Sequence, residues 1–389
     1  MKNLVLLFQK NNLCHIKPKI EKGIIRIQIS SEDRPFSGIE IKKILNVVNS
    51  IHEYYKGTKI PIYFYFNEVT FIDKLTYIFV ECICYYLIKV YNTRVQIFMR
   101  VEKDIGTEGI VSSPLLLLNE TSNDKVKMFI EKFHKDTYGY HYRRVVDSHN
   151  KEGTNYLGDI YEEVDSFLKV FGIDNDCRDD VSLVVSELIG NSAEHANSDC
   201  LVDIDVTREY NKTTGKKLDD NYYYGLNIVI MNFSEKLLGN DIGNNILDCD
   251  KNGFSDRYKM IFDTFENHRS MFNEDYKEED FRNITAFQKK ISGRIAKFNT
   301  GGTGLAKFIK SLEERSEAYR CYVISGGRCI NFYSKMLEYD EDGWIGFNCS
   351  HNYLSGIPGE DVTTDCFIYM PGTAYNFNFI MKGDKIFDE

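Results

Sequence analysis

The stretch from Ser186 to His195 holds the residues of this chain that are best suited to chemistry. It reads Ser-Glu-Leu-Ile-Gly-Asn-Ser-Ala-Glu-His, so Glu187, Asn191 and His195 recur at every fourth position. If the run is one helix, these three side chains share a face. A glutamate there can orient or deprotonate water, an asparagine oxygen can ligate a hard cation, and an imidazole can donate to an anion. A solvated polar face is the alternative that this stretch alone leaves open.

A glycine-rich segment far downstream is the second candidate. Backbone N–H groups of glycines that open a helix can come close to a phosphate, and threonine hydroxyls add donors. A plain connector is the alternative; the segment lacks the Gly-Lys-Ser/Thr ending of a Walker loop. Its residues are Thr300, Gly301, Gly302, Thr303, Gly304 and Leu305, followed directly by the helix-like Ala306 to Leu312.

Length and composition limit the class of protein. A chain of 389 residues with 43% hydrophobic residues predicts two or three domains with ample cores. The formal net charge of −10 argues against a general nucleic-acid or membrane-surface binder. The 10 cysteines are scattered without a CxxC pair, which favours reduced thiols in a cytoplasmic protein. No apolar run is long enough for a membrane helix, and we expect a strand at residues 1–9.

The elements that must position the candidates fall into two groups. Residues 1–119 alternate strands and helices, which predicts a small α/β domain. Residues 120–389 begin with helices and end with strands, which predicts an α/β sandwich with a mixed, mainly antiparallel sheet rather than a doubly wound one. In the first domain we expect strands at 23–30, 60–66 and 94–99 and helices at 39–55 and 77–91. In the second we expect a helix at 158–171, strands at 201–206, 224–231, 365–370 and 374–380, and a hairpin of 319–325 with 328–333 around Gly326-Gly327.

Three motifs in the second domain resemble those of the GHKL ATPases, the fold shared by gyrase, histidine kinases and anti-sigma-factor kinases. Glu187-Leu188-x-x-Asn191-Ser192-x-Glu194-His195 resembles the N-box of that family. The segment from Thr300 to Leu305 resembles its second glycine box. Phe367-Ile368-Tyr369-Met370-Pro371-Gly372-Thr373 resembles the Gly-Thr turn before its final strand.

The resemblance implies ATP and Mg²⁺ as cofactors. Asn191 would ligate the metal ion, and Glu187 would position or deprotonate the water that attacks the γ-phosphate. Residues about 239–299 would form an ATP lid, in which Ser292-Gly293-Arg294 and Lys297 either reach a phosphate or are simply exposed. The implied nucleotide-binding residues are Asn191, His195, Asn232, Thr300, Gly301, Gly302, Thr303, Gly304, Leu305 and Thr373.

One motif departs from the family pattern. The first glycine box, Asp-x-Gly-x-Gly, should follow the strand that ends at Met231, but the chain reads Asn232-Phe233-Ser234-Glu235-Lys236. The family aspartate accepts a hydrogen bond from the adenine amino group. The amide oxygen of Asn232 can still accept that bond, and its NH₂ can face the ring nitrogen. A lost nucleotide site is the alternative.

The first domain resembles a STAS domain, the fold of anti-sigma-factor antagonists, through its element order and its Val69-Thr70-Phe71-Ile72-Asp73 turn. Phosphorylated members carry Ser or Thr almost directly after the aspartate, whereas Thr76 comes one position late here. A docking or dimerisation module is the favoured interpretation of this domain. A protein partner bound through it and a homodimer both stay open.

Three functions remain open. The first is a Mg²⁺-dependent ATPase acting as a nucleotide-driven regulatory switch. The second is a serine/threonine kinase of the anti-sigma-factor type that acts on a STAS partner or on its own first domain. The third is a scaffold that binds the nucleotide without turnover.

Overall fold

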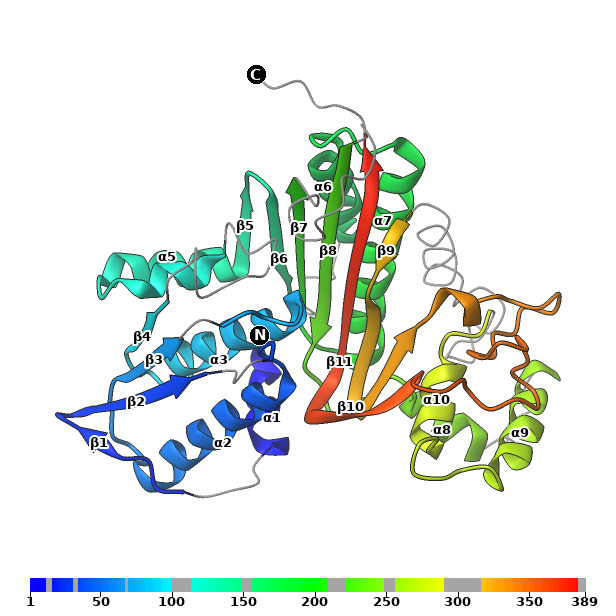
Figure 1. Ribbon diagram of the computed structural model, residues 1–389, viewed down its shortest axis with the longest axis horizontal. Helices are drawn as coiled ribbons and strands as arrows, with labels where there is room; N and C mark the ends of the chain where they lie inside the picture. Colours follow the sequence, from blue (N-terminus) through cyan, green and yellow to red (C-terminus); the bar gives the residue numbers. More distant parts are fainter. Residues whose placement is uncertain are drawn as a thin grey trace.

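The computed structural model describes residues 1–11, 16–30, 34–66, 69–99, 113–147, 155–208, 222–247, 256–289 and 316–383. The fold is mixed α/β, as the sequence predicts, and contains a mixed four-stranded sheet and an antiparallel seven-stranded sheet (Figure 1). We call residues 1–119 the N-terminal unit and the seven-stranded sheet the large sheet.

In its described residues, the N-terminal unit combines three α-helices with the small sheet. β2, β3 and β4 are parallel, and β1 runs antiparallel to β2. Local capping fixes the starts of two helices: Ser37 and Glu40 form a capping box at α2, and Asp73 accepts the Thr76 N–H at 2.8 Å at the start of α3. The elements are η1 (Lys2–Leu4), α1 (Val5–Lys10), β1 (Ile20–Glu21), β2 (Ile24–Ile29), α2 (Gly38–Tyr54), β3 (Ile62–Phe66), α3 (Lys74–Lys89), β4 (Val95–Phe98) and η2 (Pro114–Asn119).

The strand predicted at residues 1–9 is wrong, because this segment is helical. Leu4, Leu7 and Phe8 are buried together in the core of the N-terminal unit. Their spacing of three and four residues places them on one face of a helix, whereas a strand would send Leu7 and Phe8 to opposite sides. Burial of one apolar face therefore decides the local structure.

The large sheet has the strand order β10-β11-β8-β7-β6-β5, and β9 also pairs with β11. All neighbouring strands are antiparallel. Its strands are β5 (Lys135–Tyr138), β6 (His141–Val146), β7 (Cys200–Arg208), β8 (Tyr222–Asn232), β9 (Ser316–Tyr319), β10 (Cys321–Phe332) and β11 (Thr363–Gly383). The helices around it are α5 (Asn123–His134), α6 (Tyr156–Lys169), α7 (Asn175–Asn191), the π-helical segment η3 (Ser192–Ala196), α8 (Asn240–Leu247), α9 (Asp256–Arg269), α10 (Glu278–Thr285) and η6 (Ser334–Met336).

The predicted hairpin at Gly326-Gly327 is wrong, because β10 runs straight through these residues. Register shifts on both sides of Gly326 interrupt its pairing with β11, and Gly326 has a φ of +61°. The two glycines thus form a bulge rather than a turn. The two predicted strands at 365–370 and 374–380 likewise belong to one long strand, β11.

Both faces of the large sheet are buried, and they belong to different cores. Ile228 and Ile230 of β8 lie in the core with α6 and α7, while the intervening Val229 and Met231 lie in the core of the N-terminal unit. Figure 1 shows α6 and α7 against one face of the sheet and the N-terminal unit beside it. The alternation of side chains along a strand thus joins two apolar layers through one sheet.

A third body, which we call the helical lobe, consists of α8, α9 and α10 together with residues 334–362. Its core includes Phe281, Trp344 and Tyr353, and Arg328 of β10 donates to both oxygens of Asp280 at 2.7 Å. The predicted lid at about 239–299 lies partly in this packed lobe, and its residues 248–255 and 290–299 lie outside the described ranges.

Candidate functional site

Three predicted motifs meet where β8, β11 and the end of α7 come together. Asn232 is the last residue of β8 and pairs with Thr373 of β11. Its Oδ1 accepts the backbone N–H of Thr373 at 2.8 Å. The altered first glycine box and the predicted Gly-Thr turn are therefore in direct contact.

The segment after α7 is tied to the same place through Ser234. Its Oγ donates to the carbonyl oxygen of Ala196 in η3 at 3.2 Å, and its N–H donates to Pro371 O at 3.3 Å. We call the group formed by Ala196, Asn232, Ser234 and residues 371–373 the strand-end junction. It brings the end of the predicted N-box beside the other two motifs.

Gly372 makes this approach of the chains sterically allowed. Its φ is +91°, and a Cβ at this position would lie 2.5 Å from Asn232 O and 2.8 Å from Asn232 Oδ1. Any larger residue would push β8 and β11 apart at the junction. The glycine in the predicted Gly-Thr turn is thus required by geometry.

Glu187 and Asn191 lie near the end of α7, which leads directly into η3 and so to Ala196 of the junction. Asp174 caps the helix by accepting the Cys177 N–H at 3.0 Å. Glu187 is half-buried, and its charge adds to burial in raising the pKa of Tyr375 on β11. Asn191 is exposed at the last α-helical position.

The predicted row of three residues is only partly realised. The α-helix ends at Asn191 and continues as the π-helical η3, so α-helical spacing relates Glu187 to Asn191 but not Asn191 to His195. The structure describes the backbone of His195 and not its side chain. The predicted phosphate loop, Thr300 to Leu305, lies outside the described residues.

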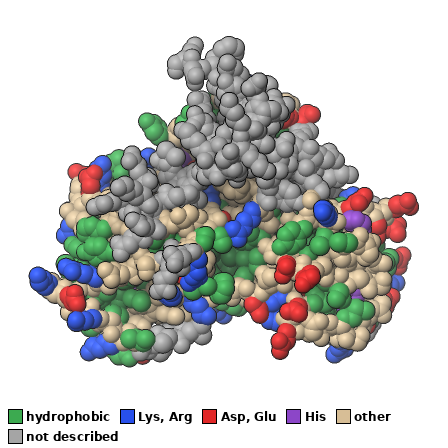
Figure 2. Space-filling model, in the orientation of Figure 1, with side chains coloured by type: hydrophobic (Ala, Val, Ile, Leu, Met, Phe, Trp, Pro, Cys, Tyr) green, Lys and Arg blue, Asp and Glu red, His purple; other side chains and the backbone are tan. Residues whose placement is uncertain are grey.

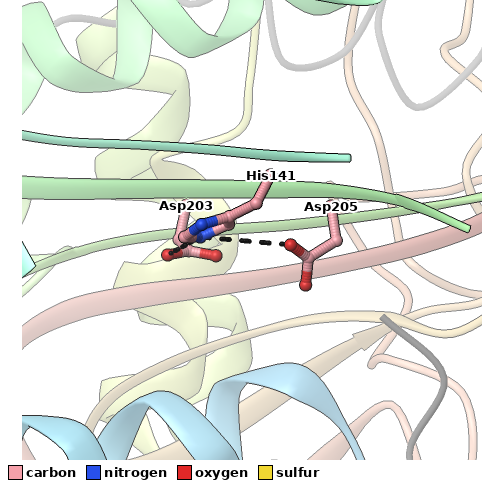
Figure 3. Close-up of side chains that lie close together, drawn as sticks. All are labelled: His141, Asp203 and Asp205. Atoms are coloured by element: carbon pink, nitrogen blue, oxygen red, sulfur yellow. Dashed lines mark hydrogen bonds and ion pairs between the residues drawn. The ribbon is translucent and has the colours of Figure 1, made fainter. Parts of the chain in front are cut away.

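Sequence reasoning missed a buried ionic cluster on the other face of the large sheet. Figure 3 shows that His141 of β6 and Asp203 and Asp205 of β7 point toward one another. His141 Nε2 lies 2.9 Å from Asp203 Oδ2, and the ligand atoms of all three residues lie within 4.8 Å of one another. Such a group could in principle hold a metal ion.

Two cations of the chain already occupy this group. Lys74, the first residue of α3, forms ion pairs with Asp203 at 2.5 Å and with Asp205. Arg143 of β6 pairs with Asp203 and with Glu81 of α3. A metal ion would have to displace these cations, so the group is better explained as the ionic contact that joins the N-terminal unit to the large sheet.

His141 holds its proton more strongly inside this cluster than in the unfolded chain. Burial alone would lower the pKa of His141, but the charges of Asp203 and Asp205 and hydrogen bonds to Asp136 and Asp203 raise it to about 9. Four carboxyl groups and four basic groups face one another in the cluster. The carboxyl groups are those of Glu81, Asp136, Asp203 and Asp205, and the basic groups are those of Lys74, Lys132, Arg143 and His141.

A cavity of about 690 Å³ lies between the N-terminal unit and strands β10 and β11. Figure 2 shows hydrophobic side chains gathered in the hollow between the two lower lobes of the molecule. Phe79 of α3 and Ile368 of β11 contribute to the apolar lining, and Asp73 and Tyr322 contribute polar groups. Of the predicted site residues whose side chains the structure describes, none lines this cavity.

The comparisons with protein families, curated proteins and solved structures find no match to this chain. Among the described residues, no helix has both the length and the apolar character needed to cross a bilayer. The function must therefore be argued from the site itself.

Proposed function

We propose that this chain binds a purine nucleoside triphosphate with Mg²⁺ at the strand-end junction and hydrolyses it as a regulatory switch. ATP is the nucleotide that the GHKL resemblance implies. The observation that carries the proposal is the pair of hydrogen bonds that joins motifs far apart in the sequence, Asn232 to Thr373 and Ser234 to Ala196. Residues that meet only in the fold, and that share one predicted role, support a common site.

Two side chains near the end of α7 suit the binding of Mg²⁺ and the hydrolysis of the nucleotide. Asn191 presents an amide oxygen near the C-terminal end of α7, where the helix dipole favours a cation. Glu187 is a half-buried carboxylate one turn earlier and suits the role of positioning water. The predicted loop at Thr300 to Leu305 would hold the phosphates.

Phosphotransfer to the first domain has less support. Thr76, the hydroxyl nearest the predicted acceptor position, is 6% exposed, and its Oγ1 donates to Asp73 Oδ1 at 2.8 Å. Its helix α3 is held on the large sheet through Lys74. A kinase acting on a separate partner and a scaffold without turnover remain as the other candidates.

The cytoplasm stays the proposed compartment, and free, buried thiols such as Cys82 and Cys84 support it.

The test compares nucleotide binding and phosphate release by the wild type and two variants. For Asn191→Ala we expect at least about a tenfold loss of Mg²⁺-dependent affinity, because the ion loses a ligand. For Glu187→Ala we expect binding to persist and hydrolysis to fall by about 10²-fold or more. Asn175→Ala at the other end of α7 and Glu162→Ala on α6 are matched controls.

Each outcome separates the candidates. Hydrolysis that continues unchanged in Glu187→Ala removes Glu187 from catalysis. Binding without phosphate release in every protein favours the scaffold, and transfer of the labelled phosphate to a protein favours the kinase. A wild type that binds neither ATP nor GTP with Mg²⁺ contradicts the proposal.

A further inference from the structure

We propose that Asn232 makes the strand-end junction selective for purines with a keto oxygen at C6, such as guanine and hypoxanthine, over adenine. The inference rests on the proposed function, because it names the base of the nucleotide bound there. The reason is the hydrogen bonding of the Asn232 amide. Its oxygen accepts a bond from the protein, and its NH₂ group is available to donate to a ligand.

The orientation of the Asn232 amide is fixed by its partner. The Thr373 group that lies 2.8 Å away is a backbone N–H, which can only donate. The amide atom facing it must therefore be the oxygen, because the NH₂ end would place two donors against each other. Gly372 leaves room for this arrangement, since a Cβ there would lie 2.8 Å from the same oxygen.

The NH₂ end of Asn232 is the group that remains. Asn232 is 4% exposed, and within the described ranges the only hydrogen bond found for its side chain is the one at Oδ1. As an amide NH₂ group, Nδ2 can only donate hydrogen bonds, so it calls for an acceptor on whatever lies beside it. A ligand that supplies an acceptor at this point gains a hydrogen bond, whereas a ligand that presents a donor there does not.

The two classes of purine differ in the hydrogen-bonding group that they carry at C6. The keto oxygen at C6 of guanine or hypoxanthine accepts a hydrogen bond from Nδ2, whereas the 6-amino group of adenine would place a donor against a donor. Bidentate pairing with adenine would need Oδ1 to accept a second bond while Nδ2 donates to N1. An aspartate would present a second acceptor instead of the donor, which reverses the preference for the group at C6.

The experiment measures dissociation constants of non-hydrolysable GTP, ITP and ATP analogues with Mg²⁺ by calorimetry. For the wild type we expect GTP and ITP to bind about tenfold more tightly than ATP or better. For Asn232→Asp we expect ATP to become the tightest ligand. Asn331→Asp on β10 makes the same chemical change far from the junction and should leave the ratios unchanged.

The outcomes distinguish this inference from the proposed function. A wild type that binds ATP as tightly as ITP or more tightly overturns the base assignment and leaves the nucleotide site standing. Loss of ATP affinity in a folded Asn232→Asp variant indicates bidentate adenine pairing and also overturns it. Absence of binding by all three nucleotides overturns both. The comparison of ITP with ATP in the wild type needs no variant, so it holds even if Asn232→Asp fails to fold.

Discussion

At the residue scale, His141 shows how burial beside carboxylates changes a side chain. Its ring is enclosed by Asp136, Asp203 and Asp205, with Arg143 and Lys74 among the same carboxylates. The pKa of His141 is raised to about 9, so the folded protein holds the proton more tightly than the unfolded chain does. Folding stability is therefore linked to this protonation.

The sign of the linkage gives a prediction for pH. A raised pKa contributes stability that is fully present below the unfolded value of about 6.5 and is lost as pH rises through about 9. We expect the free energy of unfolding to fall by about 3 kcal/mol across this window. Urea unfolding at pH values from 6 to 9.5 measures it.

The variant His141→Gln should abolish most of this slope and be less stable than the wild type at pH 6.5. His351→Gln, in the helical lobe beside Glu338, is the control that should keep the slope. Burial lowers the pKa values of the partly buried His52 and His134 and of the buried His268, so these residues titrate below the window. An equal slope in wild type and His141→Gln would contradict the assignment.

The sequence could not reveal this cluster. Residues 201–206 alternate between apolar and acidic side chains, a pattern that predicts a strand with one solvated face. In the fold, the face with Asp203 and Asp205 is covered by α3, whose Lys74 and Glu81 come from a distant segment. Local pattern fixes which residues share a face, but only tertiary packing decides what that face meets.

At the element scale, the sequence predicts where β7 and β8 of the large sheet lie better than it predicts how strands are connected and paired. The predicted strands at 201–206 and 224–231 correspond to β7 and β8. The predicted hairpin in β10 fails because a Gly-Gly pair suits a bulge as well as a turn, and only the pairing partner decides between them. The meeting of Asn232 with Thr373 likewise depends on strand order, which local patterns do not encode.

Gly372 allows a test of the junction as an element. For Gly372→Ala we expect a loss of about 1–3 kcal/mol in the free energy of unfolding, because φ is +91° and the new Cβ would lie 2.5 Å from Asn232 O. Gly327→Ala is the matched control, since a Cβ there meets nothing within 4 Å. Urea denaturation measures both, and equal stabilities would show that the turn relaxes without strain.

At the scale of the whole molecule, the N-terminal unit and the large sheet share one core. Leu7 of α1, Ile83 of α3 and Phe133 of α5 belong to the same apolar cluster as Met231 of β8 and Ile368 of β11. The domain boundary predicted near residue 120 stays a prediction, but the packing does not stop there. Apolar burial and the ionic cluster around Lys74 both cross it, so we expect the two parts to unfold together.

Lys74→Met tests this coupling. Removing one cation leaves Asp203 and Asp205 buried with less compensation, which should cost about 3–5 kcal/mol. Trp344, the single tryptophan, is fully buried in the helical lobe and belongs to a different apolar cluster from the N-terminal unit, so its fluorescence reports on the helical lobe. If the parts form one cooperative unit, the urea midpoints from Trp344 fluorescence and from circular dichroism coincide in the wild type and shift together in the variant. Lys89→Met, at the exposed end of α3, is the control and should leave both midpoints in place. If circular dichroism of Lys74→Met changes at a lower urea concentration than Trp344 fluorescence, the N-terminal unit unfolds by itself and the coupling is contradicted.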